Sequence, residues 1–268
     1  MGITWIRVFL YKLITNRNLL KNLIIRDLKQ RYVGSVGGFI WSFVHPIVLL
    51  VCYTFVFSVI LKLRLDPKVG TDNFPLYLFC GILPWLMFQD TVVRNCGAIT
   101  DNAALVTKTA IPAAILPIAT TLSNLVHHLI GTIILTVTLL FFHSINLSIL
   151  WVLLYLPILI ILAQGLGWVV ASLNVFFRDT TQIVNVIMVF WFWFTPVFYP
   201  IEMVPDSFRP LIAVNPMAVM VSGYRNAFLQ LRQPDLEHLL FLVGWALVVF
   251  VVGALFFRQS KSAFADVL

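Results

Sequence analysis

The side chains best suited to chemistry in this sequence are histidines and one carboxylate within or beside long apolar runs. His127 and His128 are adjacent, His45 and His143 lie in or near other runs, and Asp90 stands near the end of another. Ionisable groups at membrane depth are functional candidates by default, and histidines with carboxylates suit proton transfer. Asp90 is the only carboxylate placed to assist them. We therefore favour interhelical hydrogen bonding by these histidines over a proton relay.

Other patterns that support catalysis or cofactor binding do not occur in the sequence. Cys52, Cys80 and Cys96 are widely spaced and form neither a metal-binding nor a disulfide pattern. There is no G-x-x-x-x-G-K-[ST] loop, no nucleophile elbow and no evident Ser, His and Asp arrangement. We expect no catalytic, metal-binding or cofactor-binding residues in this chain. If ATP drives the protein, another chain must bind it.

The composition around these residues is that of a membrane protein. Apolar residues make up 60% of the 268 residues and charged residues 11%, against roughly 45–50% and about 25% in soluble domains. The net charge of +7 could suggest nucleic acid, but seven of the 18 Lys and Arg residues precede the first apolar run. Positive charge beside a membrane segment is first a topology signal. We expect an all-α, multi-pass membrane protein with no nucleic acid partner.

The apolar runs predict six transmembrane helices, because about 20 apolar residues cross the hydrocarbon core. If both termini lie on one side, that side holds twelve of the 18 Lys and Arg residues and the other side six. The positive-inside rule then predicts that both termini are cytoplasmic. The expected spans are 36–61, 74–93, two between 109 and 177 divided by the polar stretch 143–148, one from 180 to about 200, and 239–257.

Two segments do not fit simple crossings. The stretch ITWIRVFLYKLI separates a polar from an apolar helical face, which predicts an amphipathic helix in the inner membrane interface within a cytoplasmic region 1–32. Segment 202–230 is broken by prolines, and we interpret it as two half-helices that re-enter the outer leaflet. The second begins with Asn215 as cap and Pro216 at its first position. The membrane domain is then 33–258, and 259–268 is a cytoplasmic tail.

A short polar stretch, NAALVTKTAIPAAILP, separates the second and third spans. The topology makes it cytoplasmic, and residues 100–110 can form about two turns of helix capped by Thr100 or Asp101. Pro112 disfavours helix at the residue before it and begins the third span. The spacing alone slightly favours an ordinary polar loop over a helix laid across the inner face. Such a helix would act as a lever.

The motif FFRDTTQ joins the fourth and fifth spans with almost no loop. Asp179 and Gln182 suggest a capping-box-like helix start, and helix termination and partner contact are equally favoured roles for Arg178 and Asp179. The aromatic run that follows, FWFWFTPVFYP, covers all sides of a helix. About half of these rings suit a lipid-facing belt, and the others must face protein or a pathway.

Six segments between residues 26 and 229 resemble, in order, the permease subunits of ABC-2 type transporters that export polysaccharides. The family includes O-antigen, capsular polysaccharide and teichoic acid exporters. The segments are RDLKQRYVGSVGGFIWSFVHPIVLLVCYTFVFSVI, FPLYLFCGILPWLMFQD, NAALVTKTAIPAAILP, LNVFFRD, FWFTPVFYP and NPMAVMVSGYRNAFL.

The resemblance implies a homodimeric permease of the bacterial inner membrane that works with two copies of a separate ATP-binding subunit. ATP and Mg²⁺ bind that subunit, and this chain is not an enzyme. The implied substrate is a lipid-linked polysaccharide such as O-antigen or capsule. Teichoic acid export and ABC-2 export of a small molecule or peptide are alternatives. A membrane-embedded acyltransferase and a proton-coupled carrier are rivals from other classes.

The resemblance also implies three sets of functional residues. Those implied in coupling to the ATPase are Asp27, Arg31, Asn102, Leu105, Lys108, Arg178 and Asp179. Those implied in the translocation pathway, lined by the first and fifth spans, are Trp41, Phe190, Trp191, Trp193, Phe194, Phe198 and Tyr199. The outer re-entrant element contributes Asn215, Pro216, Tyr224 and Arg225. Thr107 and Ile111 depart from the family pattern, which often has a basic and an aromatic residue at these places.

Overall fold

The computed structural model describes residues 15–31, 33–62, 71, 73–108, 111–142, 147–230 and 232–268. Within these ranges the regular structure is helical and no strand occurs, which confirms the all-α fold. The amphipathic helix expected at residues 3–14 lies outside the described residues. The α-helices are α2 (Arg17–Gln30), α3 (Trp41–Tyr53), α4 (Phe74–Gly97), α5 (Ala103–Lys108), α6 (Ile115–Phe142), α7 (Val152–Phe176), α8 (Thr180–Trp193), α9 (Arg209–Ala213), α10 (Pro216–Arg225), α11 (Leu236–Ser260) and α12 (Phe264–Val267).

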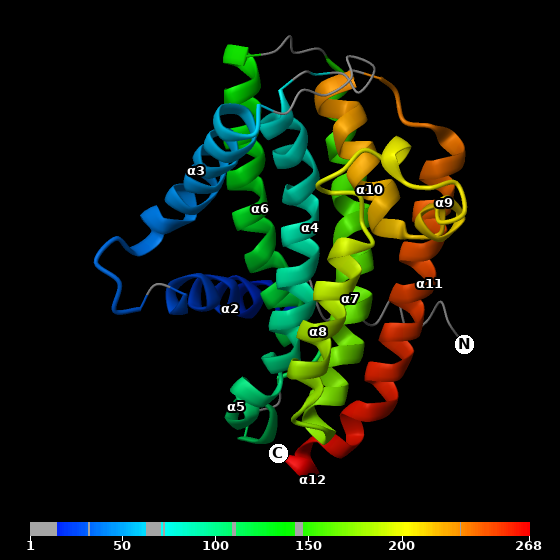
Figure 1. The fold of residues 1–268 in the computed structure, drawn as a ribbon. Coiled ribbons are helices and arrows are strands. Elements are labelled where there is room, and N and C mark those ends of the chain that lie inside the picture. Colours follow the sequence, from blue (N-terminus) through cyan, green and yellow to red (C-terminus); the bar gives the residue numbers. More distant parts are fainter. Residues whose placement is uncertain are drawn as a thin grey trace.

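Shorter 3-10 and π segments extend several of these helices. The π segments η2 (Thr54–Ile60) and η7 (Asn226–Gln230) continue α3 and α10, and the 3-10 turn η4 (Thr100–Asn102) leads into α5. The long helices run roughly along one axis, and α2 lies across it (Figure 1). We call the end of the bundle that carries α5 and α12 the α5 end.

Five helical stretches of the described chain are long and apolar enough to cross a membrane. They are Gly38–Ile60, Phe74–Gly97, Ile115–Phe141, Leu147–Phe176 and Leu236–Ala263. These five match the expected first to fourth and sixth spans. The expected fifth span contains only the 14-residue helix α8, which at 1.5 Å per residue is about 21 Å long. The helix ends before Pro200 because Pro196 disfavours helix at the residue before it.

Helix α4 forms the centre of the bundle. Most of its residues are buried, because α6, α7, α8 and α10 pack around it. This explains why its apolar residues cover every face instead of forming one stripe. Helices α7 and α11 pack so closely that their backbones approach each other at Gly165 and Gly253. A Cβ on Gly253 would lie 2.0 Å from the Gly165 carbonyl oxygen, so only glycines allow these two backbones to approach.

The first span has the opposite character to α4. No residue is buried in the apolar stretch of 18 residues within Gly38–Ile60. Helix α3 leans away from the other long helices (Figure 1). Its exposed side chains are large and apolar, and they include Trp41, Ile47 and Val51. An apolar helix face that the rest of the chain leaves exposed must contact lipid or another chain.

The α5 end has its own hydrophobic cluster. Leu23 of α2, Trp168 of α7, Phe257 of α11 and Phe264 of α12 are buried together in it. Leu105 of α5 packs against the same cluster. Side chains from elements distant in sequence therefore fix α2, α5 and α12 to the ends of the long helices.

Candidate functional site

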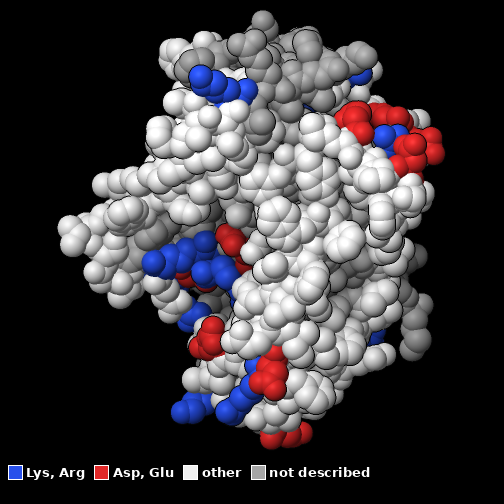
Figure 2. Space-filling model, in the orientation of Figure 1, with Lys and Arg blue, Asp and Glu red and all other residues white. Residues whose placement is uncertain are grey.

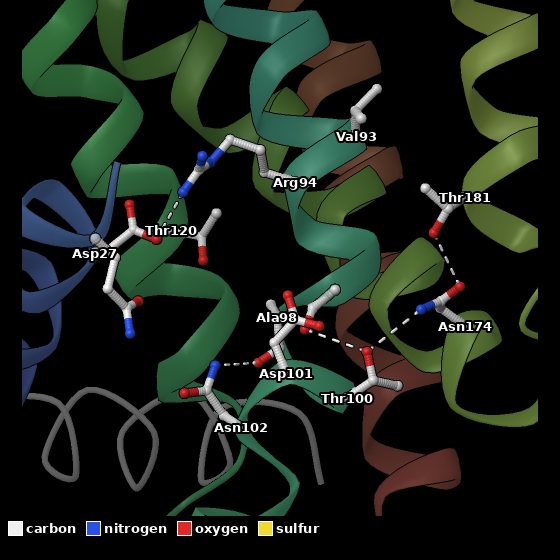
Figure 3. A pocket seen from close by; sticks show the side chains of 12 residues that line it. Asp27, Val93, Arg94, Ala98, Thr100, Asp101, Asn102, Thr120, Asn174 and Thr181 are labelled. Carbon is white, nitrogen blue, oxygen red and sulfur yellow. Dashed lines mark hydrogen bonds and ion pairs between the residues drawn. The ribbon is translucent and has the colours of Figure 1, made fainter. Parts of the chain in front are cut away.

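A cavity of about 440 Å³ opens where α2, the end of α4, η4, α6, α7 and α8 converge. Polar side chains supply most of its lining, and Figure 3 shows them approaching from these separate elements. The lining residues are Asp27, Gln30, Val93, Arg94, Gly97, Ala98, Thr100, Asp101, Asn102, Thr120, Asn174 and Thr181. Asp27 and Asn102, two of the residues implied in coupling, therefore meet at one site.

Asp27 fixes α2 to two membrane helices. Its Oδ1 accepts a hydrogen bond from Arg94 Nη2 of α4 at 2.8 Å, and its Oδ2 lies 3.4 Å from Arg31 Nε. Ser123 of α6 also donates to Oδ2. The Asp27 side chain is only 20% exposed, so these charge-assisted contacts are better shielded from water than surface ion pairs.

Arg31 extends the same network along α6. It donates to the Oδ1 atom of Asn124, and Asn124 Nδ2 donates to Thr91 Oγ1 of α4 at 3.2 Å. Burial and the neighbouring Arg94 charge lower the pKa of Arg31, whereas Asp27 opposes this shift. Arg31 thus belongs to an internal charge network at the base of the membrane helices.

The segment η4–α5 is linked to helices on two sides. Arg26 of α2 donates to Asn102 Oδ1, and Asn102 Nδ2 donates to the Ala98 carbonyl at 3.0 Å. On the other side, Asn174 Nδ2 lies 3.5 Å from Thr100 Oγ1. Thr181 of α8 donates to Asn174 Oδ1 at 3.1 Å. A chain of polar contacts therefore connects α2, η4, α7 and α8, and Figure 3 shows the part that runs from Thr100 through Asn174 to Thr181.

The expected cap of the short helix was wrong. Ile99 occupies the N-cap position, and no side-chain cap hydrogen bond forms there. Thr100 Oγ1 instead donates back to the Gly97 carbonyl at 3.3 Å. The hydroxyl bonds the preceding turn because the chain leaves α4 through a helical turn and not through extended backbone.

Residues Ala103–Lys108 form the amphipathic helix α5, and not the ordinary loop that the spacing alone slightly favoured. Leu105 and Val106 pack against the hydrophobic cluster of the α5 end, whereas Thr107 and Lys108 are exposed. Thr107 Oγ1 donates to the Ala103 carbonyl at 3.0 Å and does not reach outward. One side of α5 is therefore fixed, and the side with Lys108 is open to a partner.

The turn between α7 and α8 exposes Arg178 and Asp179. Asp179 stands at the N-cap position, but its side chain makes no cap hydrogen bond, so the expected capping box was wrong. Its φ and ψ of −73° and −8° are helical, whereas a capping side chain needs the extended backbone of a true N-cap. Both charged side chains are left facing outward beside the α5 end.

Helix α12 is a participant that sequence reasoning missed. The buried Phe264 ring lies 6.1 Å from the Phe176 ring and 5.4 Å from the Phe257 ring, centroid to centroid. The helix also contacts α5. The sequence suggested only a tail at 259–268, since four helical residues give no periodic signal. One large aromatic residue among small and charged neighbours was the only sign of an anchor.

The aromatic residues implied in the pathway divide into two groups. Trp41, Phe190, Trp193 and Phe194 are 51%, 64%, 61% and 51% exposed. Trp191 instead turns inward, with its ring 5.1 Å from the Phe88 ring in an edge-to-face contact. The sequence predicted that rings on α8 must face in different directions, and these placements confirm it.

Phe198 and Tyr199 follow α8 and connect it to its surroundings. The Phe198 ring stacks on Trp193 at 5.9 Å and lies 6.4 Å from the Tyr53 ring of α3. The Tyr199 hydroxyl donates to the Trp193 carbonyl at 2.8 Å. These contacts place the end of α8 against the first span.

Asn215 caps α10, with Pro216 in the first turn, as the sequence predicted. Its Oδ1 accepts from the Met217 amide at 3.0 Å and from Trp191 Nε1 at 2.9 Å. Its Nδ2 donates to Thr195 Oγ1 at 3.0 Å. One amide thus joins the start of α10 to the end of α8.

Arg225 and Tyr224 hold the opposite end of α10. Arg225 is buried, donates to the Pro196 and Val197 carbonyls at 2.7 and 2.6 Å, and lies 3.5 Å from the Tyr77 ring centroid. A buried cation is stabilised here by carbonyl dipoles and a ring face. Arg225 and Tyr224 therefore have structural roles, because their contacts connect α10 to the chain after α8 and to α6.

His128 makes the interhelical hydrogen bonds that the sequence favoured. Its Nδ1 lies 3.3 Å from the Leu83 carbonyl oxygen of α4, and its Nε2 lies 2.9 Å from the Tyr224 hydroxyl. Since a carbonyl only accepts, Nδ1 donates and Nε2 accepts from the tyrosine. The imidazole thereby joins α6 to α4 and α10.

Comparison with known proteins connects this arrangement with a family. The ABC-2 type transporter model matches residues 18–229. The O-antigen export system permease protein RfbA of Myxococcus xanthus is 31% identical over 93% of this chain and 95% of its own length. An RfbA of Klebsiella pneumoniae is 29% identical over 91% and 92%, and the polysialic acid transport protein KpsM of Escherichia coli is 21% identical over 90% and 93%. The chain therefore belongs to the ABC-2 type transporter family.

Proposed function

We propose that this chain is the membrane subunit of an ATP-driven exporter that moves a lipid-linked polysaccharide across the bacterial inner membrane. The similarity over nearly the whole length to permeases named for O-antigen and polysialic acid export carries this proposal. The chain supplies transport and not catalysis. ATP and Mg²⁺ bind a separate subunit, present in two copies around a permease dimer.

The proposed topology has six spans with both termini in the cytoplasm. The fifth span consists of α8 and the irregular chain that follows it to Pro200. Segment 202–230, with α9 and α10, re-enters the outer leaflet. The burial of α10 against α4 supports this, because backbone of this kind is tolerated at membrane depth only when protein or a wet cavity surrounds it. The α5 end is then cytoplasmic.

The ATPase docks on the outward side of α5, with α2 and the turn at Arg178 and Asp179 beside it. Movement of α5 passes to α2 through Asn102 and Arg26, and from α2 to α4 and α6 through Asp27. A second route passes from Thr100 through Asn174 to the start of α8. The second route matters most, because α8 is one wall of the proposed channel.

The channel forms between two protomers, where the exposed faces of α3 and α8 come together. The sugar moves along the exposed rings of Trp41, Phe190, Trp193 and Phe194, which present flat apolar faces. ATP drives this movement only if it binds the closed and open states unequally. Contact with the coupling helices supplies that difference.

Docking is tested by charge reversal on α5. The change of Lys108 to Glu should reduce copurification of the ATPase and glycan export by about tenfold, the effect of roughly 1.4 kcal/mol of lost contact. The matched control is Arg232→Glu, an exposed cation beside the start of α11. Full retention of ATPase and export in the Lys108→Glu variant would refute the docking role. Export of a labelled small molecule, with no glycan export, would contradict the proposed substrate class but not the docking role of α5.

A further inference from the structure

A second cavity, of about 400 Å³, lies between α3, α4 and α6. It is separate from the cavity of the α5 end, although Arg31 of the charge network reaches it. Its walls are apolar where Leu49, Phe79 and Met87 line it, and polar where it meets Arg31, His45, Asp90, Asn124, His127 and His128. Figure 2 shows charged side chains of both signs in a hollow below the overhang of α3.

Asp90 is the unusual member of this lining. It belongs to a membrane-spanning helix and is exposed. Its carboxylate forms no ion pair or hydrogen bond with any residue that the structure describes. Carboxylates at membrane depth almost always face a partner or water. The charges of Arg31, Arg94 and His45 act on Asp90, but its carboxylate oxygens still have room for direct contact with a cation.

Arg31 provides the opposite charge in the same cavity. Its Nε and Nη2 atoms are used by Asp27 and Asn124, whereas Nη1 has no hydrogen bond partner among the described residues. The cavity thus has an available donor on a cation and an available acceptor on an anion.

These groups lie toward one end of α4. Asp90 is seven residues from the end of α4 at Gly97, about 10 Å along a helix of 1.5 Å rise. Head-group regions begin at the edge of a hydrocarbon core about 30 Å thick. Trp41 of α3 lines the cavity and has an exposed apolar ring that suits contact with acyl chains.

We propose that this cavity binds the head group of an inner-leaflet phospholipid with a phosphate and a primary ammonium, such as phosphatidylethanolamine. The phosphate contacts Arg31 and the ammonium contacts Asp90. The lipid fills the hollow and supports α3, which the protomer leaves uncovered. This inference rests on the proposed function only for the membrane orientation of the chain.

The lining charges favour a zwitterion over the phosphate groups of a lipid-linked substrate. Arg31 is already paired with Asp27, and Asp90 would repel a multiply charged anion. A zwitterion satisfies Arg31 and Asp90 together. Binding of an anionic lipid is therefore an outcome of the test that contradicts the proposal.

The test is lipid retention by the purified permease–ATPase complex. The complex is equilibrated in nanodiscs of equal phosphatidylethanolamine and phosphatidylglycerol, and lipids that remain bound are identified by native mass spectrometry. We expect the wild type to retain phosphatidylethanolamine preferentially. Asp90→Asn should lower its ratio to phosphatidylglycerol by about tenfold, as expected for one lost charge-assisted hydrogen bond. Asp90→Glu should restore the preference.

The matched control is Glu237→Gln, which removes an exposed carboxylate in the first turn of α11 and should leave the ratio unchanged. Equal ratios for wild type and Asp90→Asn, or retention of no lipid by the wild type, would overturn the proposal. The measurement needs no glycan. A failure of the export hypothesis and a failure of this lipid site can therefore be told apart.

Discussion

Asp27 accepts hydrogen bonds from α4 and α6 while it belongs to α2. A carboxylate in this position contributes more than a surface ion pair, because Arg94 and Ser123 belong to two helices that would otherwise move separately from α2. Arg94 contacts it at 2.8 Å across 67 residues of sequence. At the scale of single residues, this contact links α2 directly to the membrane helix α4.

We predict that Asp27→Asn lowers the thermal stability of the permease and uncouples ATP hydrolysis from export. The loss should be about 1.5–3 kcal/mol, the range for hydrogen bonds to charged groups. Arg94→Ala should have a similar effect, and the double variant should lose clearly less than the sum of the two single losses. The measurements are the melting temperature of the purified complex and the glycan exported per ATP hydrolysed. Additive losses would show that Asp27 and Arg94 act independently.

Residue-level predictions from sequence succeeded where chemistry was local. Asn215 followed by Pro216 fixed a helix start without any knowledge of the tertiary structure. The same reasoning failed for Thr100 and Asp179, because both lie in helical backbone that continues from the preceding turn. The contacts of Asn174 and Thr181 could not be predicted, since they depend on how α7 and α8 meet η4.

Helix packing at the element scale depends on glycine at one crossing. Gly165 of α7 and Gly253 of α11 lie against each other so closely that a Cβ on Gly253 would lie 2.0 Å from a carbonyl oxygen. Gly244 lies on the same helix α11 with nothing within 4 Å of an added Cβ. The two positions separate the packing effect of an alanine from its effect on helix propensity.

We predict that Gly253→Ala destabilises the protein by about 1–3 kcal/mol, the usual cost of overpacking. Gly244→Ala, its matched control, should be neutral or stabilising by up to about 1 kcal/mol, because alanine favours helix. The thermal midpoint of each purified variant measures the difference. Equal midpoints for the two variants would mean that α7 and α11 separate without cost.

Apolar run lengths alone located five of the six expected spans, and these five are helices long and apolar enough to cross a membrane. The short α8 could not be separated from its irregular continuation, because residues after Trp193 remain as apolar as those before. An apolar composition indicates that a segment is buried in lipid or protein, but it does not indicate where a helix ends. Prolines and tertiary contacts determine the helix end. The support that α12 gives α5 likewise depends on tertiary contacts.

The molecule as a whole presents two helices with exposed apolar faces, α3 and α8, and one well-packed interior around α4. Two tryptophans of α8 that are two residues apart in sequence lie on different sides of this division, one on the exposed face and one in the interior. Trp193 is 61% exposed on the proposed channel face, whereas Trp191 donates to Asn215 inside the protomer. The role of each should therefore differ in the assembled transporter.

We predict that Trp193→Ala lowers export and glycan-stimulated ATP hydrolysis several-fold, with little change in melting temperature. Trp191→Ala should lower the melting temperature, because it removes a hydrogen bond and an interior ring. Val251→Ala, an exposed apolar position on α11, is the control for truncation on a surface outside the channel. Unchanged transport in Trp193→Ala would assign that ring to the lipid belt.

Phe264 offers an experimental route into the transport cycle. Its burial holds α12 against the elements that carry α5, while Val267, in the last turn of α12, is 51% exposed. A fluorophore attached at residue 267 would therefore report optically when the ATPase arrives and when it releases, while the hydrogen-bonded network above it stays intact.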